Sequence, residues 1–132
     1  MPVADTEVLF ALRPTDRKHH AVIKLLRTLP NVVVPDTALL EFELVLRGKG
    51  LPDGDVMKAL ELIKRILGQL GISQVKTLDI DLLIQHNKIM MDYGLSFFDS
   101  LIAASALSLD KVVISDDRDF DKVPGLKRIA IR

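Results

Sequence analysis

The sequence predicts an α/β fold, a three-layer α/β/α sandwich around a central parallel sheet of four to five strands. Two observations support this prediction: short apolar runs alternate with longer segments of helical period, and the connections between them are short. Strands that alternate with helices imply parallel pairing, with helices on both faces of the sheet. A length of 132 residues suits one domain, so residues 1–132 are expected to form a single domain.

The expected strands are short runs of mainly apolar residues. In chain order they cover residues 2–5, 32–34, 73–77, 112–115 and 128–131. The first strand runs directly into a helix at Asp5-Thr-Glu-Val-Leu, and the fourth is followed by the acidic turn Asp116-Asp-Arg-Asp119. Functional crevices of open parallel sheets lie beyond the carboxyl ends of the strands, where the strand order reverses. Residues that end the first and fourth strands are therefore expected to face one crevice.

The expected helices have apolar residues at spacings of three and four. Residues 17–29 place Val22, Leu25 and Leu29 on one face, and Pro30 stops them. The second helix covers 37–47 and closes at a glycine pair; the third covers 55–70 and ends before Gly71. The last two helices cover 79–93 and 97–109.

Composition excludes several classes of protein. The chain has no cysteine, which excludes disulfides, thiolate metal sites and cysteine nucleophiles. The remaining metal ligands are carboxylates, backbone carbonyls and three histidines without zinc-type spacing, so a bound metal would be Mg²⁺ or Mn²⁺. The formal net charge is zero, which gives no overall attraction to nucleic acid but allows a local basic rim. No apolar run is long enough for a membrane span, so a cytoplasmic protein is expected.

Four acidic residues stand where the chain is otherwise apolar. Asp5 and Asp117 follow predicted strands, Asp99 lies in the apolar stretch FFDSLIAASALSL, and Glu41 lies among Ala38, Leu44 and Val45 at helical spacing. A buried carboxylate is costly unless a cation compensates it. Four such residues spread over the chain indicate one shared cation site.

Each acid also has a structural interpretation that the sequence leaves open. Asp5 suits a helix N-cap, and Asp99 follows Ser96 at the spacing of a capping box. Asp117 lies in a turn of the kind that Asp favours, with Phe120 as the apolar residue that fixes it. Glu41 competes with Glu43 for the inward position, and Glu43 has Arg47 four residues on as an exposed partner.

The order of these motifs resembles the PIN-domain nucleases. The matching segments are VADTEVLFAL, VPDTALLEFELVL, LSFFDSLIAASAL and VVISDDRDF, which together span nearly the whole chain. The resemblance implies a catalytic set of Asp5, Glu41, Asp99 and Asp117. Asp5, Asp99 and Asp117 would bind the metal, and Glu41 would bind it or orient water. Ser115 matches a position that usually holds Thr or Ser, and Asp119-Phe120 matches a common Asp-Phe pair.

The chain departs from the family at Glu7, where Asn or a small polar residue is usual. Glu7 adds charge to the metal site, changes its affinity or faces solvent; the sequence leaves these alternatives open. Thr6 is a further supporting residue, which could share the capping role of Asp5.

Length and compactness are most similar to the VapC-type toxins of toxin–antitoxin operons. This resemblance implies a Mg²⁺- or Mn²⁺-dependent endoribonuclease that cuts single-stranded RNA, forms a homodimer and is inhibited by a cognate antitoxin. Since an acidic pocket repels RNA, nearby cations must supply affinity. The candidates are Arg13, Lys18, Arg47, Lys49 and Arg118.

Three other functions share some of these sequence features. Asp5-Thr-Glu7 is similar to the Asp-x-Asp motif of haloacid-dehalogenase-like phosphatases, but Glu replaces the second Asp and no cap insertion is evident. A non-catalytic PIN-like module would bind RNA or protein without cutting, although the chain keeps all four acids. A receiver domain lacks support because no Asp ends the strand at 73–77.

Overall fold

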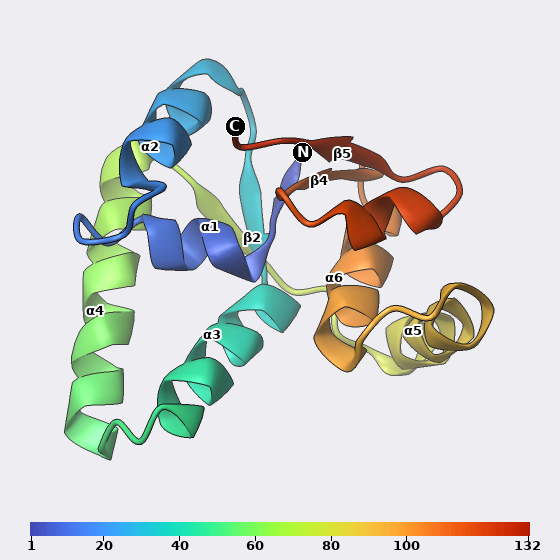
Figure 1. Ribbon diagram of the computed structural model, residues 1–132, viewed down its shortest axis with the longest axis horizontal. Helices are drawn as coiled ribbons and strands as arrows, with labels where there is room; N and C mark the ends of the chain where they lie inside the picture. Colours follow the sequence, from blue (N-terminus) through green and yellow to red (C-terminus); the bar gives the residue numbers. More distant parts are fainter.

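Five short strands form one fully parallel sheet in the order β3-β2-β1-β4-β5 (Figure 1). The structure is a computed structural model that describes residues 1–132. The strands are β1 (Val3–Ala4), β2 (Val33–Pro35), β3 (Ser73–Val75), β4 (Val112–Ile114) and β5 (Lys127–Ile129). The predicted strands are therefore all present, although most are one or two residues shorter than expected.

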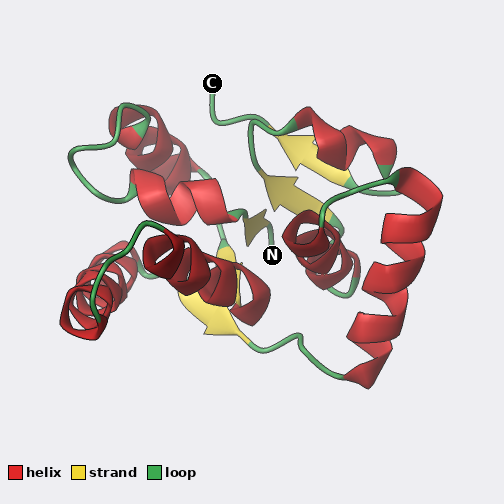
Figure 2. Cartoon of the chain, turned by 60° about the horizontal axis from the view of Figure 1, so that its bottom comes forward, coloured by secondary structure: helices red, strands yellow, loops and turns green.

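Six α-helices and one 3₁₀ helix, η1, connect the strands. They are α1 (Thr6–Ala11), α2 (His19–Thr28), α3 (Asp36–Gly48), α4 (Asp53–Leu70), α5 (Ile80–Tyr93), α6 (Phe97–Leu107) and η1 (Arg118–Lys122). The acidic turn expected after the fourth strand thus continues into η1. Helices lie on both sides of the sheet, which confirms the predicted three-layer architecture (Figure 2).

The strand order reverses at β1. The chain adds β2 and β3 on one side of β1, then crosses over through α5 and α6 to add β4 and β5 on the other side. Because such crossovers are right-handed, the reversal puts α5 and α6 on the face opposite the first four helices. In the register, Val3 pairs with both Val33 and Val113, and the Asp5 amide donates to the Ile114 carbonyl at 3.1 Å. The carboxyl ends of β1 and β4 therefore meet at the switch point.

Side-chain hydrogen bonds explain where some predicted elements end. Thr77, expected in the third strand, instead donates both its amide and its hydroxyl to Asp36 Oδ1, at 3.0 and 2.8 Å. Helix α4 begins two residues earlier than predicted, directly after Pro52, whose extended backbone forms the N-cap. It ends as predicted at Gly71, which has φ 68° in the left-handed region that favours glycine.

The core lies on both faces of β1 and β4. Val3, Val113 and Ile114 are inaccessible to solvent or nearly so, and Phe42 and Phe120 are the largest fully buried side chains. Helix α6 is buried at every residue from Ser100 to Ala106, which explains why its sequence is apolar on all sides. No helix is both long enough and apolar enough to span a membrane.

Candidate metal centre

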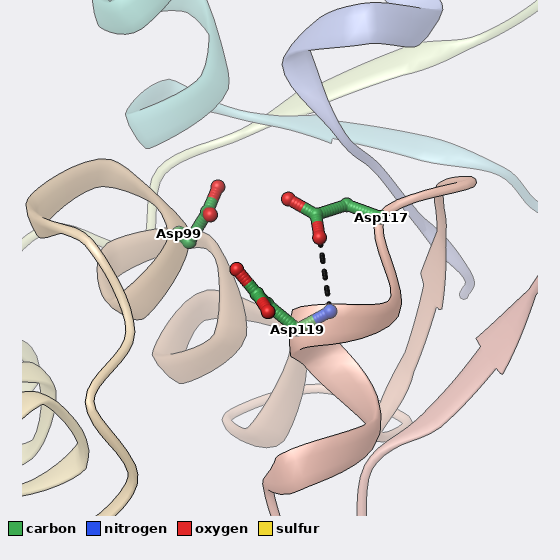
Figure 3. A group of neighbouring side chains, drawn as sticks. All are labelled: Asp99, Asp117 and Asp119. Carbon is green, nitrogen blue, oxygen red and sulfur yellow. Dashed lines mark hydrogen bonds between the residues drawn. The ribbon is translucent and has the colours of Figure 1, made fainter.

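Three carboxylates converge at the carboxyl edge of the sheet, beside the switch point. Asp99 from α6 and Asp117 and Asp119 from the start of η1 each offer an oxygen, and these oxygens lie within 4.8 Å of one another. Figure 3 shows the three side chains directed toward a common space. The group does not include Asp5 or Glu41, which the sequence analysis placed in the catalytic set, and it does include Asp119, which was expected only in support.

Asp99 lies in the first turn of α6, where the Ser96 hydroxyl caps the helix by accepting from the Asp99 amide at 3.3 Å. The capping interpretation therefore applies to Ser96, and the Asp99 carboxylate is not needed as the cap. Burial, together with the nearby charges of Asp117 and Glu41, raises the pKa of Asp99 to about 6. No cationic side chain forms an ion pair with Asp99 or Asp117.

Asp117 and Asp119 are ordered by a local turn. One Asp117 carboxylate oxygen accepts from the Asp119 amide at 2.9 Å and so caps η1, while the Asp117 amide donates to Ser115 Oγ at 3.0 Å. Phe120, which is fully buried, holds the start of η1 against the core. Asp119 is more open: its side chain is 50% exposed and forms an ion pair with Lys122 at 3.1 Å.

Asp5 is buried at the end of β1 and is itself the N-cap of α1. Its Oδ1 accepts from the Thr6 amide and its Oδ2 from Ser115 Oγ, both at 2.7 Å. Burial raises the pKa of Asp5 to about 7, against the lowering effect of these hydrogen bonds, and Asp99 and Glu7 add to the rise. Asp5 can therefore cap α1 and also contribute its charge to the acidic site, because its two oxygens accept hydrogen bonds from different neighbours.

Glu41, rather than Glu43, lies on the side of α3 that faces the acids. Thr6 Oγ1 donates to Glu41 Oε1 at 2.5 Å, which ties α3 to the start of α1. Glu43 instead pairs with Arg47 at 3.2 Å. The influence of Glu41 on the pKa of Asp99 shows that the two carboxylates share one electrostatic environment.

The Glu7 carboxylate contacts Lys18 and the turn that follows β4. Its Oε1 accepts from the Asp116 amide at 2.5 Å and lies 3.0 Å from Ser115 Oγ, while its Oε2 is 3.2 Å from Lys18 Nζ. No spacing in the sequence signals this arrangement, because Lys18 is eleven residues away from Glu7 and 98 away from its second partner, Asp116.

The predicted RNA-binding cations have different surroundings. Lys18 pairs with Glu7 and Asp116, and Arg47 pairs with Glu43 and Asp53. The Arg13 and Lys49 cations both lie 5.1 Å from the centroid of the Phe10 ring, one turn of α1 beyond Glu7. Arg118 is exposed at the start of η1.

The donor set fits a hard divalent cation. Carboxylate oxygens at this spacing are the ligands that Mg²⁺ and Mn²⁺ prefer, and no sulfur or histidine ligand stands among them. Burial and neighbouring carboxylates raise the pKa values of Asp99 and Asp5, and an ion held there would favour their charged forms.

One protein family matches the sequence of this chain. The sequence model of the PIN domain matches residues 3–126. No curated protein matches the chain.

Several solved structures share the fold. The chain superposes on Mycobacterium tuberculosis VapC20, described as a sarcin–ricin loop cleaving toxin, with a TM-score of 0.71 at 18% identity, covering 92% of this chain and 93% of that one. A toxin–antitoxin complex from Klebsiella pneumoniae gives a TM-score of 0.70 at 17% identity, with 100% of this chain and 98% of that one covered. DNA-bound VapBC from Salmonella typhimurium gives a TM-score of 0.68 at 17% identity, with 100% of both chains covered.

Proposed function

The chain belongs to the PIN-domain family, and we propose that it is an endoribonuclease that cuts single-stranded RNA with a bound Mg²⁺ or Mn²⁺ ion. The observation that supports this most strongly is the convergence of Asp99, Asp117 and Asp119 without a cationic partner for the first two. A divalent ion would complete the charge balance of this group. When bound between carboxylates, such an ion activates water and stabilises the charge of a phosphodiester under attack.

The chain's own residues divide this work between them. Asp99 and Asp117 would hold the ion, with Asp119 as a more exposed third donor. Asp5, fixed by Thr6 and Ser115, would add negative charge from the floor of the site. Glu41, held by the Thr6 hydroxyl, would orient water on the α3 side.

The test is cleavage of single-stranded RNA by the purified protein. We expect cleavage with Mg²⁺ or Mn²⁺, its loss in EDTA, and its recovery when excess Mn²⁺ is restored. Asp99→Asn should abolish cleavage while the protein stays folded, because the substitution removes a ligand and relieves repulsion with Asp117. Asp92→Asn, an exposed change on α5, is the matched control and should cut normally. Normal cleavage by Asp99→Asn would refute the assignment.

The phosphatase alternative has no support in the structure. Glu7, which would replace the second Asp of the phosphatase motif, has both carboxylate oxygens engaged by Ser115, Asp116 and Lys18. A p-nitrophenyl phosphate assay separates the two functions. Turnover of this compound that depends on Asp5, together with intact RNA, would favour the phosphatase.

We further propose that the chain is the toxin of a toxin–antitoxin pair. The likeness of its fold to VapC20 and to toxin–antitoxin complexes supports this role. Expression of the wild-type chain alone should arrest cell growth, whereas Asp99→Asn should not. Rescue by a small open reading frame adjacent to the gene would identify the antitoxin, and growth unaffected by the active enzyme would contradict the toxin role.

A homodimer is also proposed, as the resemblance implies. Helix α5 supports it, because Ile80, Ile84 and Met91 lie at helical spacing and are 74%, 64% and 83% exposed. Exposed apolar surface of this kind is typical of protein interfaces. Sedimentation should show a dimer for the wild type and a shift toward monomer for Ile84→Lys; a monomeric wild type would contradict the proposal.

A further inference from the structure

We propose that Glu7, Lys18 and Asp116 form a latch that fixes the turn 115–117 and thereby positions Asp5 and Asp117, with Lys18 as a positioning residue. This inference rests on the proposed function for its consequence, but the latch itself consists of contacts between side chains of this chain. It assigns Glu7 and Lys18 roles other than metal binding and RNA binding.

The first half of the latch joins α1 to the turn. Glu7, in the first turn of α1, accepts the Asp116 amide on Oε1 at 2.5 Å, and the same oxygen lies 3.0 Å from Ser115 Oγ. The backbone after β4 is thus held directly by a carboxylate from the helix after β1. These are the two strands that meet at the switch point.

Lys18 is the cation between the two acids. Its ammonium lies 3.2 Å from Glu7 Oε2 and 2.8 Å from Asp116 Oδ2. The Lys18 side chain is only 19% exposed, and its amide donates to Asp16 Oδ1 at 2.8 Å, so the loop that carries it is also fixed. A lysine enclosed in this way is poorly placed to bind a phosphate, because binding would require it to abandon two carboxylates.

The second half of the latch holds the turn from the opposite side. Asp116 Oδ1 accepts from the amides of Ile131 and Arg132 at 2.7 and 3.3 Å. Each of the four carboxylate oxygens of Glu7 and Asp116 therefore already has a hydrogen-bond donor within 3.2 Å. A metal ion on either side chain would therefore have to share or displace an oxygen that already accepts a hydrogen bond.

Ser115 links the turn to the acidic site through its hydroxyl. Its Oγ lies 2.7 Å from Asp5 Oδ2, 3.0 Å from Glu7 Oε1 and 3.0 Å from the Asp117 amide. Its single proton can serve Asp5 or Glu7 at one time, while its lone pairs accept from Asp117. A shift of the turn would therefore move Asp117 relative to Asp5. The carboxylate oxygens would then no longer lie at the spacing that a hard ion requires.

The charge of Lys18 and its positioning role have opposite effects on metal affinity. If Lys18 acted only through its electric field, its removal would leave the pocket more negative and tighten Mn²⁺ binding. If it acts by holding the turn, its removal releases two carboxylates and weakens Mn²⁺ binding. The sign of the change separates the two roles.

The experiment compares Lys18→Met, Lys18→Arg and, as a control for loss of one lysine charge, Lys24→Met on the exposed side of α2. Mn²⁺ binding is measured by calorimetry without RNA, and the turn is followed by hydrogen exchange at the amides of Asp116 and Asp117. We expect Lys18→Met to weaken Mn²⁺ binding about tenfold, equivalent to roughly 1.4 kcal/mol. Both amides should exchange faster, Lys18→Arg should restore most of the affinity, and Lys24→Met should match the wild type.

Tighter or unchanged Mn²⁺ binding by a folded Lys18→Met protein would overturn the proposal. So would a raised KM for RNA with a reduced salt dependence at unchanged Mn²⁺ affinity, because that pattern marks a phosphate-binding lysine. If Lys18→Met does not fold, Glu7→Ala takes its place, because it removes both the acceptor of the Asp116 amide and the charge that faces Lys18. Glu7→Ala should speed exchange at that amide; unchanged exchange would refute the latch.

The test of the latch can fail or succeed independently of the test of ribonuclease activity. A wild-type protein that binds Mn²⁺ but leaves RNA intact would refute the ribonuclease and still test the latch. A wild-type protein that binds no Mn²⁺ would refute the metal centre, and the exchange rates alone would then decide whether the latch exists.

Discussion

The residues that define the site are acids held close together, in surroundings that disfavour their charged forms. Asp5 and Asp99 have raised pKa values because burial disfavours their charged forms and neighbouring carboxylates repel them. Asp36 provides the contrast. Three backbone amides and the Thr77 hydroxyl donate to it, and the pKa of this carboxyl is lowered. Asp36 is therefore a structural carboxylate, whereas Asp5 and Asp99 are suited to a cation.

These pKa shifts predict how the stability of the metal-free protein depends on pH. A carboxyl group whose pKa is higher in the folded state binds more protons when folded, so its contribution to stability falls as pH rises. For Asp5 this window runs from about pH 4, its unfolded value, to about pH 7. Asp5→Asn should therefore gain stability relative to the wild type across this window, reaching roughly 1–3 kcal/mol at pH 7.5.

Thermal unfolding in EDTA at several pH values measures the effect of Asp5→Asn. Asp92→Asn, which is exposed on α5, should show no such trend. A wild-type protein that gains stability over Asp5→Asn as pH rises would contradict the raised pKa.

Arg13 supports a separate prediction about the substrate. Its guanidinium and the Lys49 ammonium lie against the same Phe10 ring, beyond the acidic site along α1. Arg13→Ala should raise the KM for RNA and reduce the slope of log affinity against log salt by about one, because one phosphate contact is lost. Mn²⁺ affinity should not change. An unchanged salt slope would place the RNA elsewhere.

At the scale of elements, η1 is the piece that presents two of the three converging carboxylates. It is short, and its position depends on Phe120, which is fully buried. Asp117 and Asp119 therefore depend on a packing contact as well as on their own hydrogen bonds.

Phe120→Ala should lower the free energy of unfolding by about 3–5 kcal/mol, as expected for loss of a buried aromatic ring. Phe120→Leu should cost less, because it fills more of the space. In whichever variant remains folded, Mn²⁺ affinity should fall with stability, measured by denaturant unfolding and calorimetry. Full Mn²⁺ affinity in a destabilised Phe120→Ala protein would show that η1 is positioned without this ring.

The packing of α5 against α6 contains a buried histidine. His86 Nδ1 lies 3.1 Å from Ser100 Oγ, which itself donates to the Phe97 carbonyl at 2.7 Å, and Asn87 Nδ2 lies 3.3 Å from His86 Nε2. Ser100 Oγ therefore accepts from His86 Nδ1, and Asn87 donates to the opposite nitrogen, which is the pattern for a neutral ring. Burial lowers the pKa of His86.

A lowered histidine pKa means that the unfolded chain takes up protons first, so His86 costs stability as pH falls below about 6.5. This trend is opposite to that of Asp5. His86→Leu should therefore become more stable relative to the wild type on acidification from pH 7.5 to 5, as measured by thermal unfolding in EDTA. His20→Leu, an exposed change in α2, is the control. A difference that does not depend on pH would contradict a neutral buried His86.

Much of this arrangement could be predicted from the sequence because it depends on local patterns. Apolar periodicity located the helices, and Asp5 and Asp117 were recognisable as acids that follow strands. Local patterns could not show which acids come closest, because that depends on how α6 and η1 pack. Asp119 was therefore expected only as a supporting residue, and its close grouping with Asp99 could not be predicted. The partnership of Lys18 with Glu7 and Asp116 is a tertiary contact that no spacing signals.

At the scale of the whole molecule, the site exists because the strand order reverses at β1. The reversal brings β1 and β4 together at one edge, and α6 and η1 then add their acids beside it. With a formal net charge of zero, the chain combines a concentrated acidic pocket with positive charge elsewhere. Metal binding should therefore stabilise the entire fold, by an amount that grows with the free Mn²⁺ concentration.

If these carboxylates form one divalent metal site, the ion should be visible in a crystal. The measurement uses a crystal soaked in Mn²⁺, at a wavelength with strong manganese anomalous scattering. We expect a manganese peak about 2.1 Å from carboxylate oxygens of Asp99 and Asp117, at the spacing of hard-cation ligands. No peak at millimolar Mn²⁺, or a peak on Glu7 and Asp116 instead, would contradict it.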